Sequence, residues 1–213
     1  MNAMSAWMPM CGQAWWAAAA AFVGMWCAMM AAMMLPSLLP MLHRYRRALG
    51  TIGRPRRDGL TLVAAAGYSA VWIAIGIAAF AFGRALAEFG MRMPALAHAA
   101  SNAAGVVALA AGTLQFTRWK AQHLARCREA LDCCARWDPS AGAAWLDGLR
   151  LGIHCACSSA GPTALLFAVG MMDTTAMVLA TVAITAERIA PARLRTPQVV
   201  GAFMIGVGLS LVT

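Results

Sequence analysis

Long runs of residues without charge constrain this chain more than any other feature. Residues 1–43, 59–83 and 93–117 contain no Asp, Glu, Lys or Arg. Because a helix rises about 1.5 Å per residue, about 20 apolar residues cross the hydrocarbon core of a bilayer. Hydrophobic residues make up 62% of the chain and charged residues 12%, against about 45–50% and about 25% in ordinary globular chains. The sequence therefore predicts an all-α, polytopic membrane protein.

The apolar runs predict six membrane-spanning helices within a single membrane domain, residues 1–213. The predicted spans are residues 15–35, 60–82, 94–116, 145–169, 171–186 and 197–212. A charged loop, residues 117–144, separates the third span from the fourth. Within it Leu124, Cys127, Leu131 and Cys134 recur at helical spacing, which predicts an amphipathic helix on the inner membrane surface.

The arginines and lysines predict the orientation of the spans. They concentrate in three loops, and the opposite side holds only Arg84 and Arg92. The loop residues are Arg44, Arg46, Arg47, Arg54, Arg56, Arg57, Arg118, Lys120, Arg126, Arg128, Arg136, Arg188, Arg193 and Arg195. The positive-inside rule makes these loops cytoplasmic and both termini extracytoplasmic. The formal charge of +9 then indicates contacts with anionic lipids and not with nucleic acid.

Enzymatic templates are missing from the sequence. It has no glycine-rich phosphate loop, no HExxH motif and no spacing that suggests a Ser/His/Asp arrangement, so we expect no catalytic activity. Asp173 is expected to cap the helix that follows it. Gln115 is expected to form a hydrogen bond between helices. The linker of residues 46–59, rich in Gly, Pro and Arg, is expected to be irregular.

Methionines are concentrated in the first span. Met25, Met29 and Met33 follow one another at i+4, as do Met30 and Met34, so each set forms a ridge on one helix face. Thioethers suit Cu(I), but methionine also packs adaptably in interiors without a metal. Two prolines, at positions 36 and 40, are expected to end or kink this helix.

A second group of soft ligands lies in the fourth span and the loop before it. His154, Cys155 and Cys157 form a polar interruption within an apolar helix. Pro162 follows, which favours local unwinding there. His123 and Cys127 are spaced i, i+4 on one face of the loop helix. Thiols and imidazoles suit copper, although buried cysteines also serve as small apolar residues.

Several segments together resemble a bacterial family of integral membrane proteins regarded as metal-binding, some of them as copper chaperones. WCAMMAAMMLPSLLP is similar to the Met-rich signature of that family. Further similar segments are GYSAVW, AGTLQFTRWKAQHLARCR, LRLGIHCACSSAG, GMMDTTAM and the pair Glu187-Arg188. The resemblance implies a six-span protein of the bacterial inner membrane that handles copper.

The chain also departs from that family pattern. His123 stands where the family has a cysteine, and Cys155 matches a family cysteine. Ser158 and Ser159 replace two further cysteines, and Ala160 replaces a tryptophan. Cys157 and His123 are the residues that would compensate for these missing thiols.

The sequence supports two functions of different classes. The first is binding of Cu(I) for storage or for delivery to a membrane or extracytoplasmic partner protein. Its predicted ligands are Cys155, Cys157, Cys127, His123, His154, Met30, Met33 and Met34. The alternative is a non-catalytic accessory or assembly subunit of a larger membrane complex, without a metal of its own. A solute transporter would carry an intramembrane charge and matched broken helices, which the sequence does not suggest.

Overall fold

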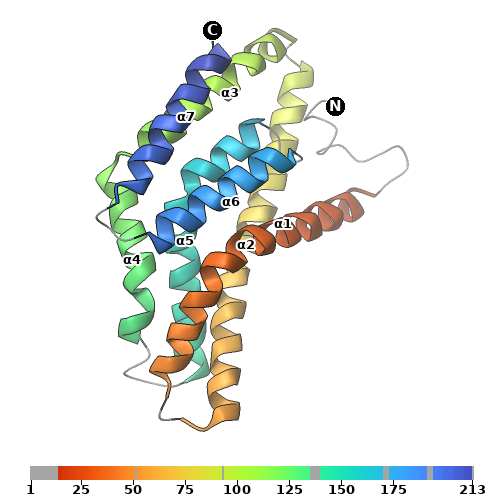
Figure 1. Ribbon diagram of the computed structural model, residues 1–213. Helices are drawn as coiled ribbons and strands as arrows, with labels where there is room; N and C mark the ends of the chain where they lie inside the picture. Colours follow the sequence, from red (N-terminus) through yellow and green to blue (C-terminus); the bar gives the residue numbers. More distant parts are fainter. Residues whose placement is uncertain are drawn as a thin grey trace.

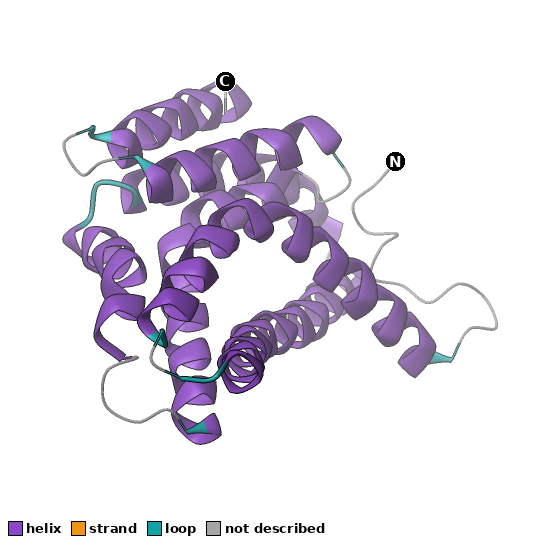
Figure 2. Ribbon diagram, turned by 60° about the horizontal axis from the view of Figure 1, so that its bottom comes forward, coloured by secondary structure: helices purple, strands orange, loops and turns teal. Residues whose placement is uncertain are grey.

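The computed structural model describes residues 14–50, 52–92, 94–134, 140–169, 173–190 and 194–212. These residues form helices joined by short connections, with no strand among them (Figures 1 and 2). The helices are α1 (Trp15–Ala48), α2 (Arg54–Arg92), α3 (Pro94–Leu114), α4 (Arg118–Cys134), α5 (Ala141–Val169), α6 (Thr174–Ile189) and α7 (Thr196–Val212). The predicted all-α class is confirmed for the described residues.

Each predicted segment corresponds to one helix. The six predicted spans fall on α1, α2, α3, α5, α6 and α7, and the predicted amphipathic helix corresponds to α4. Within the described ranges, two segments are long and apolar enough by themselves to cross a membrane, Trp15–Pro36 and Arg54–Phe89. Shorter apolar helical segments are Ala104–Leu114 and Thr196–Leu211.

The prolines interrupt the helices less than the sequence predicts. α1 continues through Pro36 and Pro40 to Ala48, so the expected end of the helix is wrong. Figure 1 shows α1 changing direction along its length, in agreement with the expected kink. α5 likewise continues through Pro162, and the expected unwinding there is wrong. Close packing on neighbouring helices outweighs the loss of one backbone hydrogen bond.

The first linker is mostly helical, in contrast to the expected irregular segment. α1 extends to Ala48 and α2 begins at Arg54, so only a short connection remains. An ion pair joins the two helices, with Arg46 Nε 2.7 Å from the Asp58 carboxylate. The amide of Ile52 donates to the carbonyl of Leu49 within the turn. The arginines of this linker therefore lie on helix ends.

Helix α5 lies at the centre of the fold, packed against α2, α3, α4 and α6 (Figure 1). Its closest approach is to α2 and depends on glycines. A Cβ atom on Gly148 would collide with the backbone of Ala64, and one on Gly152 would collide with Val71. Small residues at such a crossing allow two helix backbones to approach closely. Gly148, Gly152 and Cys155 share one helix face, so this approach brings Cys155 against α2.

Aromatic side chains fill the interior between α1, α2 and α5. Trp26 is fully buried, and its indole N–H donates to the carbonyl of Trp72 at 2.9 Å. Its ring stacks with Phe167, with ring centroids 5.3 Å apart. Gly76 lies directly against the Trp26 ring, where a Cβ would not fit. The N-terminal half of α1 is thereby fixed on α2.

Two expected polar contacts are confirmed. The Asp173 carboxylate accepts from the amides of Thr175 and Ala176, at 2.8 and 3.1 Å, and so caps α6. Gln115 is 3% exposed, and its Nε2 lies 3.5 Å from Met204 Sδ. This second contact joins the end of α3 to α7.

We expect Gly148→Ala to destabilise the fold, because the added methyl group would push α5 away from α2. Overpacking of this kind costs about 1–3 kcal/mol. Thermal unfolding of the purified protein measures the effect. Gly24→Ala is the matched control, because a Cβ at Gly24 has no atom within 4 Å and alanine favours a helix by about 0.5–1 kcal/mol over glycine. Equal melting temperatures for the two variants would contradict the close crossing.

Candidate metal centre

The thiol of Cys155 lies where four helices meet. Cys155 is on α5, and its side chain is 0% exposed. It contacts Arg188 of α6, Tyr68 of α2 and Met34 of α1. The close crossing of α2 and α5 places Tyr68, because its carbonyl lies beside Gly152. One sulfur atom therefore connects α1, α2 and α6 to α5.

The shortest of these contacts is to a buried arginine. Arg188 Nη2 lies 2.6 Å from Cys155 Sγ and 3.5 Å from the Cys155 carbonyl oxygen. Arg188 is only 7% exposed. The guanidinium therefore places a positive charge directly beside a sulfur atom that could bind a metal ion. The Tyr68 hydroxyl, 3.0 Å from the same sulfur, adds a second polar neighbour.

A second buried thiol lies near the same arginine. Cys127 is on α4, is 0% exposed and is not in a disulfide. It is close enough to Arg188 to interact with it electrostatically, as Cys155 does. Cys127 therefore lies within electrostatic range of the guanidinium that contacts Cys155. The helices that carry the two thiols, α4 and α5, pack against each other.

Met34 contributes a thioether to the same place. Its side chain is 1% exposed, and its Sδ lies 4.0 Å from Cys155 Sγ. Two sulfur ligands about 2.3 Å from one metal, at the 120° angle of a trigonal site, are about 4.0 Å apart. The separation of these two sulfurs therefore fits a soft metal ion between them. We refer to Cys155, Cys127 and Met34 as the sulfur centre.

The other two methionines predicted as ligands pack in the apolar core that also contains Cys155. Met30 and Met33 are each 2% exposed and belong to the apolar core with Met29. Of the three methionines predicted as ligands, the structure brings Met34 to the thiol. The role of Met30 and Met33 in the fold is packing beside it.

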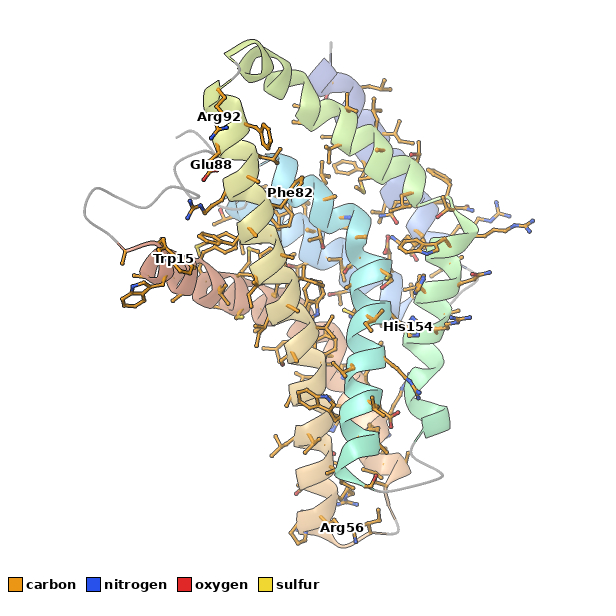
Figure 3. All side chains as sticks on the ribbon, turned by 180° about the vertical axis from the view of Figure 1, so that it is seen from behind. Trp15, Arg56, Phe82, Glu88, Arg92 and His154 are labelled. Atoms are coloured by element: carbon orange, nitrogen blue, oxygen red, sulfur yellow. The ribbon has the colours of Figure 1, made fainter. Side chains whose placement is uncertain are left out.

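Cys157 and the histidines lie on other faces of α5 and α4. Cys157 follows Cys155 by two residues, a rotation of about 200° around the helix, so the two side chains point to nearly opposite sides of α5. Cys157 is partly exposed and not in a disulfide. His154 Nδ1 lies 3.0 Å from His123 Nδ1, and Figure 3 shows His154 on the side of α5 that faces α4. The predicted ligands thus separate into a sulfur group and an imidazole pair.

The two serines that replace family cysteines lie directly beside the centre. Ser158 and Ser159 are 2% and 1% exposed. Their hydroxyls donate to the carbonyl of Cys155, at 2.9 and 2.8 Å. These bonds are the ordinary local contacts of serine in a helix. In these hydrogen bonds the serine hydroxyls contact the Cys155 carbonyl oxygen and not the Cys155 sulfur.

A buried ion pair lies next to the centre and joins α4 to α6. Lys120 Nζ is 2.7 and 2.9 Å from the two carboxylate oxygens of Glu187, and both side chains are 2% exposed. Burial lowers the pKa of Lys120, while the negative charge of Glu187 opposes that shift. Glu187 immediately precedes Arg188, so this pair fixes the segment that carries the buried guanidinium.

Sequence reasoning did not identify Arg188 and Tyr68 as neighbours of the site. Arg188 was counted among the cytoplasmic arginines, and Tyr68 entered only through the family resemblance. The signal that could have found Arg188 is its place next to Glu187, directly after the apolar predicted span of residues 171–186. Tyr68 is one of two tyrosines in the chain, but its contact with position 155 depends on long-range packing.

The candidate donor set of the centre is soft and includes a thioether. Within the described ranges, no group of three or more His, Cys, Asp or Glu side chains is placed to hold a metal ion. The candidate donors here are the two thiols and Met34. Thiolate and thioether ligands select Cu(I) over harder ions such as Mg²⁺ or Ca²⁺.

We expect Lys120→Met to destabilise the protein by about 3–5 kcal/mol, because it deprives the buried Glu187 carboxylate of the lysine charge. The double variant Lys120→Met, Glu187→Leu removes both charges. It should recover most of the loss, since apolar replacements of a whole buried pair are often neutral. Thermal melting of the three proteins measures this. A double variant as unstable as the single one would contradict a charge-compensation role.

The chain matches a known protein family over most of its length. The family model PpoB2, described as copper chaperone, matches residues 23–211 of this chain. The matched region includes all the residues of the sulfur centre, together with Tyr68 and Arg188. No curated protein and no solved structure matches the chain.

Proposed function

This chain belongs to the PpoB2 family of copper chaperones, and from that premise we propose that it is a membrane-embedded, non-catalytic protein that binds Cu(I) at the sulfur centre. The ligands are Cys155, Cys127 and Met34. The bound ion is cargo, held for storage or for delivery to a membrane or extracytoplasmic partner. The observation that carries the proposal is the buried Cys155 sulfur, 4.0 Å from Met34 Sδ and 2.6 Å from Arg188.

The outward-facing side chains support a location in the membrane. Large apolar residues that are at least 56% exposed occur on α1, α2, α3, α6 and α7. They include Ile77 and Phe82 of α2, Val178 and Val182 of α6, and Val199 and Phe203 of α7. Soluble monomers rarely expose apolar surface on this scale. Six spans, formed by all the helices except α4, would bury this surface in lipid.

The distribution of arginines supports an orientation for those spans. Figure 3 shows Arg56 and Arg92 at opposite ends of the molecule. The Arg56 end carries the arginine-rich turn between α1 and α2, so the positive-inside rule makes it cytoplasmic. We expect this end to contact anionic lipid headgroups. Both termini would then be extracytoplasmic, and a bacterial inner membrane is the expected location.

The charges around the centre support a monovalent cargo. Two thiolates with one Cu(I) ion carry a net charge of −1. A buried charge needs a partner nearby, and Arg188 supplies one positive charge at that place. Without copper the guanidinium contacts the Cys155 sulfur directly. With copper it would compensate the charge of the bis-thiolate complex.

We expect wild-type protein, purified in mild detergent with a reductant and Cu(I), to retain about one copper per chain. Cys155→Ser and Cys127→Ser should lose it, because a hydroxyl is a poor ligand for a soft ion. Cys27→Ser is the matched control, since Cys27 is a partly exposed thiol outside the sulfur centre. Elemental analysis measures the copper content per chain of each purified protein.

Copper retained by both Cys155→Ser and Cys127→Ser would contradict the sulfur centre. No copper in any preparation would contradict copper binding by this chain. A co-purifying membrane protein in that case would favour the accessory-subunit alternative. Cys157→Ser tests the remaining predicted thiol, and we expect that variant to retain copper because its side chain points away from Cys155.

We expect Arg188→Leu to weaken Cu(I) retention by about tenfold or more, the scale on which outer partners of metal ligands act. Arg188→Lys keeps the charge and should retain more copper than Arg188→Leu. Competition with a Cu(I) chelator at constant pH measures the affinities. Equal affinity in Arg188→Leu and wild type would show that the guanidinium does not compensate the bound complex. Arg46→Leu, which breaks the distant ion pair with Asp58, is the matched control.

A further inference from the structure

Two imidazoles face each other across α4 and α5, outside the sulfur centre. His123 Nδ1 and His154 Nδ1 are 3.0 Å apart, and both side chains are partly exposed. The indole of Trp119 lies against His123, with ring centroids 4.6 Å apart. Packing of this kind fixes the orientation of the His123 ring. The pair is thus accessible from outside and partly preorganised.

The pair is separate from the sulfur centre although the two are adjacent in sequence. His154 precedes Cys155 by one residue, so their side chains point about 100° apart around α5. Cys155 is 0% exposed, whereas both histidines reach the molecular surface in part. The fully buried Cys155 sulfur contacts Met34, Tyr68 and Arg188. A metal held between the imidazoles would therefore occupy a different place.

The distance between the nitrogens indicates which ion fits. Two nitrogens each about 2.05 Å from one metal and 3.0 Å apart subtend an angle of about 95° at that metal. A tetrahedral ion such as Zn²⁺ requires about 109°, which corresponds to nitrogens about 3.3 Å apart. Tetragonal Cu(II) places neighbouring ligands at about 90°. A turn of the two rings away from their present hydrogen bond would let one ion bind both nitrogens, and tetragonal Cu(II) is the ion whose preferred angle is nearest to the present spacing.

We propose that His123 and His154 form a second copper site, which binds Cu(II) through both Nδ1 atoms. Solvent completes the coordination, since within the described ranges no third His, Cys, Asp or Glu joins them.

In the metal-free protein one ring donates its Nδ1–H to the other. Binding requires that ring to carry its proton on Nε2 instead, so no proton is lost overall. Arg126 is the nearby cation, and it is exposed, so solvent screens its charge.

The test is electron paramagnetic resonance of detergent-purified protein mixed with one equivalent of Cu(II). Samples are frozen within seconds, before the thiols of the chain reduce the ion. We expect a tetragonal Cu(II) signal with splitting from two imidazole nitrogens. His123→Ala and His154→Ala should each weaken Cu(II) binding by at least about tenfold and remove the two-nitrogen splitting. His43→Ala is the matched control, because His43 is an exposed histidine on α1.

The two copper sites are distinguished by a second readout on the same proteins. Cys155→Ser should keep the two-nitrogen Cu(II) signal and lose Cu(I). His154→Ala should lose the two-nitrogen Cu(II) signal and keep Cu(I). Retention of Cu(I) also shows that the histidine variants are folded. If the wild type gives no two-nitrogen signal, or if either histidine variant keeps it, the imidazoles only join α4 to α5 and the proposal is wrong. This outcome would not affect the proposed sulfur centre.

Discussion

The contact between Arg188 and Cys155 is the interaction on which the rest of the structure depends. A buried guanidinium is costly unless it finds partners, and here its Nη2 lies 2.6 Å from the Cys155 sulfur. The neighbouring Glu187 is held by Lys120 at 2.7 Å, which fixes the end of α6 against α4. These two contacts therefore join α4, α5 and α6 around the buried guanidinium. The same arrangement, a cation beside buried thiols, suits a site that binds a soft cation and must remain stable without it.

Burial of the centre has a consequence for loading and release. Cys155 and Cys127 are both 0% exposed, so copper reaches them only if helices separate. The crossing of α2 and α5 resists separation because glycines bring the backbones into contact. On one side α4 covers the centre, held by the buried Lys120–Glu187 ion pair and by the imidazole pair. Opening on that side would require the buried ion pair to separate, which is costly.

The sequence predicted the helices well because long apolar runs and arginine clusters are local features. It also named Cys155, Cys127 and Met34 among its candidate soft ligands, since their chemistry is evident from residue type, and those ligand roles stay predictions. It did not predict that Cys157 and His154 point away from the Cys155 sulfur, because the rotation of a buried helix is set by its neighbours. The roles of Tyr68 and Arg188 depend on contacts with residues 87 and 33 positions away. α1 kinks instead of ending at its prolines, which is one of the two outcomes expected there. The unwinding expected at Pro162 was wrong because tertiary packing outweighs a local preference.

The central claim is that Cu(I) is bound by sulfur at the place where Arg188 contacts Cys155. Copper K-edge X-ray absorption on the Cu(I)-loaded, reduced protein tests it most directly, because it reports the ligand atoms and their distances. We predict two or three sulfur neighbours at about 2.3 Å, as for thiolate ligands of similar ions, and a loss of sulfur neighbours in Cys155→Ser. A first shell made only of nitrogen or oxygen would contradict the sulfur centre.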